Sequence, residues 1–562
     1  MIIVDNFSAV PSPLWPYPVR PAMWALLLLA LLGLALIEVA LQTLSPTIIG
    51  GTQPVVGALR IVIALLLFRV SLVAARSGWG LPRWSPGVLP WVAGALCLLT
   101  GWLAGTFWPN SGDEHSYTFL ADTLLAGRFS NPPPPDPELF RLFRVFTMYG
   151  HTFSQYPPGW PLVLAPFRAV GLDWLANPLL TVLLGGSLLG AMRCLKTQPP
   201  VQVGALILVL ASPFVLFNGG SMFSHMLTAA LAGMIVWQQL ADEQRPYIWR
   251  KALIGALLGA LLLTRYEAFG IIAFLYAVDR LWHRRGKALV DAMPTLLAAL
   301  PFVALYLGYD WAITGDALQT PATLTNPDMT FTEAITDLPL AALRADIHTV
   351  YWAGSLGLFG GFTLLALQMP ALVFKLRSHS LRFFDLALPA AIVFFLYFPN
   401  GGGHQYGPRY WFFAWPLAVL TVVTGLVASD GTFRLAARTY LFRGLVAANL
   451  VFCAMSLPGL IVTTRAYIDA RRSVFAGIVP VSPALVLVPS RELRLWPWRW
   501  SAVEANSLDF ARNDVDFNGP VLYGRLDAPD ALVRACRLPG RTVLVWRGPS
   551  EFIRADCGVT HP

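Results

Sequence analysis

Charged residues are scarce in this chain of 562 residues. Only 13% of its residues are Asp, Glu, Lys or Arg, roughly half the share found in an ordinary soluble protein, whereas 56% are hydrophobic. This composition excludes a soluble globular enzyme and indicates an integral membrane protein. The net charge of +9 could suggest a nucleic-acid partner. However, the basic residues are spread between apolar runs and form no single patch, so no nucleic-acid partner is expected.

Cysteine is also scarce, with five residues in the whole chain. Cys97, Cys194 and Cys453 lie in or beside apolar runs, where a free cysteine behaves as a small apolar side chain. Cys536 and Cys557 lie in a more polar C-terminal region. They could form a disulfide if that region lies outside the cytoplasm, and the sequence alone leaves this pairing open.

Apolar runs of about the length that spans a bilayer recur along the chain and are rich in Leu and Ala, which favours helices over an outer-membrane barrel. The first run follows Arg20, but no small-residue cleavage site comes after it, so it is expected to be a retained helix. We predict a mainly α, polytopic membrane protein with about 13 transmembrane helices. The runs lie near residues 22–42, 54–75, 87–107, 174–193, 201–217, 222–240, 252–264, 266–282, 288–311, 351–374, 384–399, 409–428 and 443–464.

The distribution of Lys and Arg between alternate loops predicts the orientation. All four lysines fall in loops on one side, which the positive-inside rule assigns to the cytoplasm together with the N-terminus. The opposite, outer side then carries residues 108–160, 314–350 and 400–409 and everything after residue 464. For a bacterial chain this predicts a multi-pass protein of the inner membrane, with the large polar loops on its periplasmic face.

The C-terminal region differs in character, because charge rises and the spanning runs stop after residue 464. Three short apolar stretches are typical of buried strands, and the stretch between the second and third is typical of a helix. We therefore predict a transmembrane domain over residues 1–464 and a small α/β domain over residues 465–562 on the outer face. The expected strands are 484–489, 520–526 and 542–548, and the expected helix is 527–537.

The first outer loop, residues 108–160, opens with the acidic pair Asp113-Glu114 directly after a predicted spanning helix. Two carboxylates at a bilayer surface carry a desolvation cost that is usually tolerated for a functional reason. Apolar residues at helical spacing predict an amphipathic helix over residues 114–127. The pair lies at its N-terminus, so an alternative interpretation is that Ser111 or Asp113 simply caps the helix.

Three further motifs share the outer side of the membrane. QYPPGWP (155–161) returns the first loop to the bilayer, where its prolines fix the backbone and Gly159 permits a tight re-entry. SHMLTAALAG (224–233) lies on a predicted helix, and GGGHQYGPRYWFFAWP (401–416) comes late in the chain. With the acidic loop, their order resembles the GT-C superfamily of membrane glycosyltransferases, in the branch of the protein-mannosyltransferases and lipid A aminoarabinose transferases. The resemblance extends over most of the chain.

This resemblance implies an enzyme that moves a sugar, with inversion, from a polyprenyl-phosphate donor to a hydroxyl of a cell-envelope glycan, lipid or protein. Asp113 matches the acidic residue of the family and is the predicted general base, with Glu114 as second candidate or as a residue that positions the acceptor. The anionic leaving group needs cations, and the fork of donors on arginine suits this task. The candidates are Arg265 and Arg409, with Arg344 behind them.

Six residues on the same side are predicted to contact substrate: Tyr156, His225, His404, Gln405, Tyr406 and Tyr410. Tyr156 departs from the aminoarabinose-transferase branch, which resembles this chain but carries a phosphate-binding lysine there, so phosphate binding here must depend on the arginines. Structural alternatives exist for several candidates. Arg409 could anchor a helix end at the interface, Arg265 could pair internally with Glu267, and His225 could be a core histidine.

No metal or other cofactor is expected, because His115, His151 and His348 are scattered without ligand spacing. A transporter or flippase of lipid-linked sugars is an alternative function, but it should place ionisable residues near the midplane on broken helices in repeated halves. A scaffold whose outer domain binds a partner would not explain why the acidic pair and the arginines share one side. A ligase that transfers a whole glycan from a lipid carrier remains a second alternative within the enzyme class.

Overall fold

The structure of the protein is a computed structural model, and it describes most of the chain after residue 84. Arg344, His348, His404 and Gln405 lie outside the described residues, as do the predicted runs 22–42 and nearly all of 54–75. The described residues are 85–284, 288–325, 359–398, 406–427, 434–472, 479–488, 513–548 and 550–558, with the single residues 62, 346, 352 and 356.

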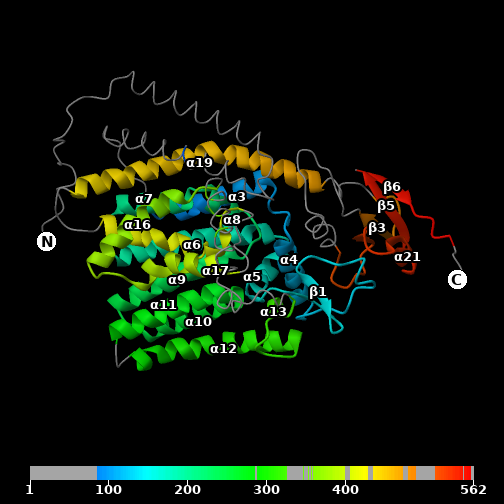
Figure 1. Ribbon diagram of the computed structural model, residues 1–562, viewed down its shortest axis with the longest axis horizontal. Helices are drawn as coiled ribbons and strands as arrows, with labels where there is room; N and C mark the ends of the chain where they lie inside the picture. Colours follow the sequence, from blue (N-terminus) through cyan, green and yellow to red (C-terminus); the bar gives the residue numbers. More distant parts are fainter. Residues whose placement is uncertain are drawn as a thin grey trace, which may run out of the picture.

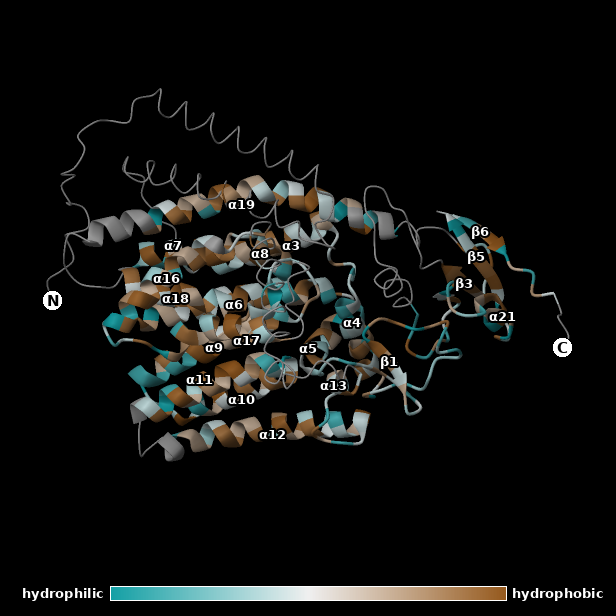
Figure 2. Ribbon diagram, in the orientation of Figure 1, coloured by the Kyte–Doolittle hydropathy of each residue, from teal (hydrophilic) through white to brown (hydrophobic). Residues whose placement is uncertain are grey.

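The described part of the membrane domain is a bundle of helices whose axes run in roughly the same direction (Figure 1). Hydrophobic residues dominate these helices, and hydrophilic residues gather at helix ends and in loops (Figure 2). The main helices are α3 (Leu89–Ala104), α6 (Ala176–Cys194), α7 (Pro199–Leu210), α8 (Pro213–Gly219), α9 (His225–Gln244), α10 (Ile248–Thr264), α11 (Tyr266–Arg284), α12 (Ala288–Thr314), α16 (Phe362–Arg377), α17 (Phe383–Tyr397), α18 (Ala418–Val422) and α19 (Arg434–Arg472).

Three described helical segments are long and apolar enough to cross a membrane: Asp173–Cys194, Asp291–Thr314 and Phe442–Ala466. A fourth is added if α7 and α8, which meet at a bend of 68°, are one broken span. The predicted count of about 13 spans is therefore not confirmed by the described residues. One reason is that some predicted runs form shorter helices; α3 ends after 16 residues because Gly105 adopts a left-handed conformation with φ 76°. The predicted break at Arg265 is present, between α10 and α11.

The first outer loop folds at one end of the bundle (Figure 1). It contains α4 (Gly112–Leu125) and an antiparallel hairpin of β1 (Val145–Met148) and β2 (His151–Ser154). It then continues into α5 (Gly159–Ala169), which packs against α4. The helix predicted over 114–127 is therefore present. Smaller elements of this domain are η1 (Asp173–Leu175), α13 (Pro321–Thr325), η3 (Arg409–Trp411), η4 (Trp415–Leu417) and η5 (Val423–Val427), the last being a turn of π-helix.

The C-terminal region forms a four-stranded sheet that lies beyond the end of the bundle that carries α4 and β1 (Figure 1). The strand order is β4-β3-β5-β6, in which β3 pairs in parallel with both β4 and β5, and β6 is antiparallel to β5. The three predicted strands and the helix are present, and β6 was not predicted. The elements are β3 (Ala484–Val488), β4 (Val521–Arg525), α21 (Ala531–Cys536), β5 (Thr542–Gly548) and β6 (Glu551–Arg554).

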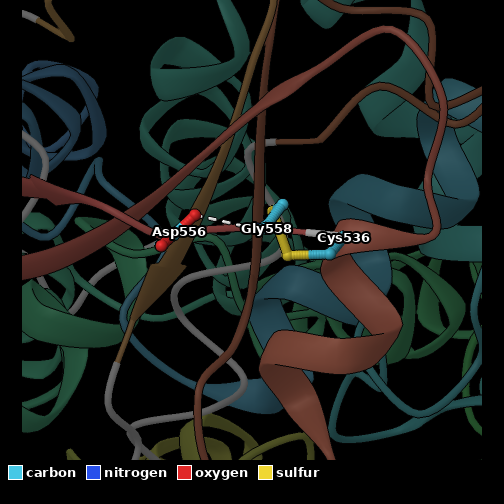
Figure 3. The surroundings of a disulfide bond; sticks show 4 residues. Cys536, Asp556 and Gly558 are labelled. Atoms are coloured by element: carbon cyan, nitrogen blue, oxygen red, sulfur yellow. Dashed lines mark hydrogen bonds between the residues drawn. A yellow bond between two sulfur atoms is a disulfide. The ribbon is translucent and has the colours of Figure 1, made fainter. Parts of the chain in front are cut away.

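A disulfide between Cys536 and Cys557 joins the end of α21 to the chain that follows β6 (Figure 3). The pairing that the sequence left open is thus formed. Before the sheet, α19 continues beyond the predicted domain boundary at residue 464 and ends at Arg472. The boundary after 464 stays a prediction, and the first strand that we assign to the C-terminal domain begins at Ala484.

Two glycines one helical turn apart allow α10 and α12 to pack closely. A methyl group on Gly255 would overlap the Thr295 carbonyl group, and one on Gly259 would lie 2.5 Å from Cβ of Phe302. Small residues at this spacing are a usual means of bringing two membrane helices together. The close approach matters for the site because α10 ends directly before Arg265.

We predict that Gly255→Ala lowers the melting temperature of the detergent-solubilised protein, because the added methyl group forces α10 and α12 apart. Overpacking of this kind costs about 1–3 kcal/mol. Gly308→Ala in α12 is the matched control, since a methyl group there meets nothing within 4 Å and Ala has the higher helix propensity. An equal or smaller loss of stability in Gly255→Ala than in Gly308→Ala would contradict the close packing.

Candidate active site

Asp113 lies in the first turn of α4, with its carboxylate directed at residues from distant parts of the chain. Ser111, not Asp113, caps the helix, because its hydroxyl accepts a hydrogen bond from the Glu114 backbone N–H at 3.2 Å. Oδ2 of Asp113 accepts from Nη2 of Arg409 at 2.7 Å, and Oδ1 accepts from the Tyr156 hydroxyl at 2.5 Å. The capping alternative therefore applies to Ser111 and leaves the Asp113 carboxylate available for other contacts.

Glu114 has a different position although it is the next residue. Its side chain is fully buried and accepts three hydrogen bonds, two through Oε2 and one through Oε1. The donors are the Asn110 backbone at 3.0 Å, the Ser111 hydroxyl at 3.1 Å and the Met222 backbone at 3.0 Å. Glu114 thus links the start of α4 to the chain before α9 by hydrogen bonds. It is not among the residues that line the cavity beside Asp113.

The two carboxyl groups also differ in their electrostatics. Burial raises the pKa of Asp113, but the charges of Arg409 and Arg144 and the hydrogen bond from Tyr156 outweigh it, so the pKa is lowered below its ordinary value. Nε of Arg144 lies 3.9 Å from Oδ1 of Asp113. Burial raises the pKa of Glu114 to about 7, because its hydrogen bonds only partly offset desolvation. Asp113 is therefore the residue of the pair that is fully ionised at neutral pH.

Arg409 is placed by a tight turn in the late motif. Tyr406 and Gly407 both have positive φ, of 57° and 98°, and a side chain on Gly407 would overlap the Phe214 ring. The guanidinium carbon of Arg409 lies 4.3 Å from the centroid of the Phe223 ring. Two of its nitrogens, Nε and Nη1, are buried without a hydrogen-bond partner among the described residues. Buried donors of this kind are costly, and they suit a site that binds an anion.

Arg265 approaches from the break between α10 and α11. Its guanidinium carbon lies 4.9 Å from the centroid of the Tyr410 ring, and Nη2 lies 3.9 Å from Oε1 of Glu267. The internal ion pair that we considered as an alternative is therefore present. Both Arg265 and Glu267 nevertheless line the same cavity as Asp113, so the ion pair does not remove Arg265 from the site.

A close backbone contact brings the returning end of the first loop to this break. A Cβ on Gly159 would lie 2.6 Å from the carbonyl carbon of Leu263 and 2.7 Å from the backbone nitrogen of Thr264. No other residue type fits at the start of α5 in this position. The contact brings Tyr156, three residues earlier, to the same cavity as Asp113 and Arg265.

These segments enclose a cavity of about 50 Å³. Its wall includes the carboxylates of Asp113 and Glu267 and the guanidinium groups of Arg144 and Arg265. The volume is far below that of an ordinary small-molecule site, so only part of a ligand can be enclosed. The remaining lining residues are Tyr117, Gln155, Tyr156, Pro157, Thr264, Tyr266, Ala322, Phe398 and Tyr410.

The predicted substrate-contacting residues separate into two groups. Tyr156 and Tyr410 line the cavity. Tyr406 is 0% exposed and packs among the rings of Phe217, Phe223 and Phe359, so it builds the turn behind the site. His225 is also buried, with its ring 5.6 Å from that of Phe223 and 6.3 Å from that of Tyr410, which is the core position considered as its alternative.

Arg144 and Gln155 line the cavity but were not among the predicted site residues. Both belong to the first outer loop, and Nη1 of Arg144 donates to Oε1 of Gln155 at 3.4 Å. Arg144 could have been selected as an outer arginine of that loop. Its left-handed backbone, with φ 67°, and its approach to Asp113 arise only from the folded loop.

Comparison with known proteins finds solved structures that align with this chain. No protein-family model matches the chain, and no curated protein matches it. ArnT from Cupriavidus metallidurans in the apo state aligns with a TM-score of 0.43 and 12% identity, and ArnT bound to undecaprenyl phosphate aligns with 0.44 and 14%. Each alignment covers 81% of this chain and 92% of that chain.

The Archaeoglobus fulgidus oligosaccharyltransferase in complex with Zn and sulfate aligns with a TM-score of 0.40 and 12% identity, over 74% of this chain and 61% of that chain. ArnT and this oligosaccharyltransferase are GT-C membrane glycosyltransferases. At these identities and TM-scores the likeness carries no argument about activity, which must rest on the geometry of the site.

We predict that Glu114 contributes a loss of stability to the folded protein as pH rises from about 4.5 to about 7. Its pKa is raised from 4.5 to about 7 on folding, so the folded state holds a proton that the unfolded state releases in this window. Each pKa unit corresponds to about 1.4 kcal/mol. Melting temperatures in detergent across this window measure the slope. Glu114→Gln should remove this contribution, so that stability falls less with rising pH in the variant than in the wild type. An equal slope in the two proteins would show that the Glu114 carboxyl group does not titrate in this window.

Proposed function

We propose that this protein is an inverting glycosyltransferase that moves a sugar from a polyprenyl-phosphate donor to an acceptor hydroxyl at the outer face of a bacterial inner membrane. The observation that carries the proposal is the convergence of three guanidinium groups on one ionised carboxylate, that of Asp113. Arg144 and Arg265 line the same cavity as Asp113, and Arg409, which is not among the lining residues, pairs with Oδ2 of Asp113 at 2.7 Å. The acid comes from the first outer loop, and the arginines come from that loop, from the α10–α11 break and from the late turn. The acceptor is a glycan, a lipid or a protein of the cell envelope.

The three arginines suit the phosphate of the donor. Arg144, Arg265 and Arg409 outnumber the carboxylates of Asp113 and Glu267 beside them, so the site has an excess of positive charge. The two unpartnered nitrogens of Arg409 can donate to phosphate oxygens. The phosphodiester of the donor is already an anion, and polyprenyl phosphate gains a further negative charge as it leaves, so its departure requires charge stabilisation rather than protonation.

Asp113 suits the role of general base. The acceptor hydroxyl gives its proton to the Asp113 carboxylate as its oxygen forms a bond to the anomeric carbon. The bond from that carbon to the phosphate oxygen breaks on the opposite face, so the configuration inverts and polyprenyl phosphate leaves. An anionic donor bound to Arg409 and Arg144 would raise the pKa of Asp113 above its value in the empty site, which brings the base closer to the range that favours proton transfer.

The size of the cavity limits which part of the donor it holds. A space of about 50 Å³ fits the phosphate region, and the sugar and the polyprenyl chain would lie mainly outside the enclosed part. Apolar helices that are long enough to span a membrane offer a lipid-facing surface for the chain. The C-terminal α/β domain lies beyond the same end of the bundle as α4 (Figure 1).

We predict that Asp113→Asn abolishes sugar transfer while the protein still folds and still binds polyprenyl phosphate. The amide cannot accept the proton of the acceptor, and loss of a general base typically costs a factor of about 10²–10⁴ in rate. The measurement is mass spectrometry of surface glycans from a deletion strain that carries each variant. Glu551→Gln, at an exposed position on β6, is the control and should restore the wild-type glycan; wild-type glycan levels with Asp113→Asn would remove Asp113 from the role of base.

We also predict that Arg409→Gln weakens binding of undecaprenyl phosphate in detergent micelles by at least about tenfold, because a buried charged donor to the phosphate is lost. Arg265→Gln should act in the same direction. Arg128→Gln is the control, since Arg128 pairs with Asp516 at 2.7 Å on the surface, away from the cavity. Equal affinities in all three variants would place the phosphate elsewhere.

A further inference from the structure

A segment of the first outer loop is built into the core of the C-terminal domain. Leu139 is 0% exposed and Phe140 is 3% exposed, and both pack in one apolar cluster with side chains of β3, β4, β5 and α21. The Phe140 ring lies 4.9 Å from that of Phe517. Residues 136–140, here called the docking segment, therefore complete a core that the C-terminal residues form only in part.

Polar contacts fix the same segment at a single register. Oδ1 of Asp136 accepts from the backbone N–H groups of Glu138 and Leu139, both at 3.0 Å, and Oδ2 accepts from Nη1 of Arg534 on α21 at 3.0 Å. The backbone N–H of Arg525, at the end of β4, donates to the Leu139 carbonyl at 2.9 Å. The docking segment cannot slide along the sheet without losing these bonds.

Arg144 follows four residues after Phe140. A chain of that length reaches at most about 14 Å, so the C-terminal domain limits where Arg144 can lie. Downstream, β1 begins at Val145, and the Arg144 carbonyl accepts from the Ser116 hydroxyl at 2.7 Å. Arg144 itself has φ 67°, and a residue other than glycine persists in that region only where its surroundings fix it. Here the docking segment fixes the chain before Arg144, and β1 and the hydrogen bond from Ser116 fix it on the other side.

We propose that the C-terminal domain is a positioning element of the active site: by burying Leu139 and Phe140 it holds Arg144 beside Asp113. The proposal rests on the proposed function in one respect, that Arg144 contacts the donor phosphate. Leu139 and Phe140 are positioning residues in this scheme, and Arg144 is the residue that touches the ligand. The disulfide between Cys536 and Cys557 fastens the end of α21, the helix that carries Arg534 (Figure 3).

The test lengthens the connection between the docking segment and Arg144 in the full-length protein. Two glycines are inserted between Arg141, which is exposed, and Leu142. The control inserts the same two glycines between Pro132 and Pro133, which are also exposed but precede the docking segment. These two proteins are called the 141/142 insertion and the 132/133 insertion. They are compared with Arg144→Gln and with a protein that combines the 141/142 insertion with Arg144→Gln. For each protein we measure the affinity for undecaprenyl phosphate in micelles and the melting temperature.

We expect the 141/142 insertion and Arg144→Gln each to weaken binding by about tenfold or more, with the 132/133 insertion near wild type. In the Arg144→Gln background the 141/142 insertion should cause no further loss, because the group it misplaces is already absent. An insertion that leaves affinity unchanged, or that weakens it equally in both backgrounds, would overturn the positioning role alone. Wild-type affinity in Arg144→Gln would overturn both the positioning role and the assignment of Arg144 to the donor phosphate.

Discussion

The ion pair between Asp113 and Arg409 is the contact on which the rest of the site depends. It joins the first outer loop to a turn 296 residues later, at 2.7 Å and with little exposure of either side chain. A buried charge that loses its partner destabilises a protein by about 3–5 kcal/mol. The Asp113 and Arg409 side chains therefore hold each other in place. The pair also allows three arginines to stand close together without substrate, because Asp113 offsets part of their mutual repulsion.

Backbone turns and close backbone contacts help to bring these charges together. Gly159 permits contact between the start of α5 and the end of α10, and Tyr156 and Arg265, which flank this contact in the sequence, line the same cavity as Asp113. Gly407 permits the turn from which Arg409 projects. Glu114 fixes the start of α4 by accepting a hydrogen bond from the Met222 backbone. The positions of the charged side chains in the site therefore depend on the turns and close backbone contacts next to them.

The sequence was informative where local composition determines the outcome. Asp113, Arg265 and Arg409 could be assigned to one side because each borders an apolar run, and the strands of the C-terminal domain follow from short apolar stretches. Tertiary contacts decided the rest. Nothing local distinguishes Glu114, which the fold buries, from Asp113, which it directs at the cavity. The predicted number of spans is not confirmed in the described residues, where the turn at Gly105 ends α3 after 16 residues and α7 meets α8 at a bend of 68°.

The most direct test of this account is an experimental structure of the protein with undecaprenyl phosphate. We expect phosphate density beside the cavity, within hydrogen-bond distance of Arg409 and of at least one of Arg144 and Arg265, with the Arg409 side chain moved from Asp113 toward the phosphate. The lipid chain should leave the cavity along the apolar surface of the bundle. Phosphate bound elsewhere, with the pair of Asp113 and Arg409 intact and the cavity empty, would contradict it.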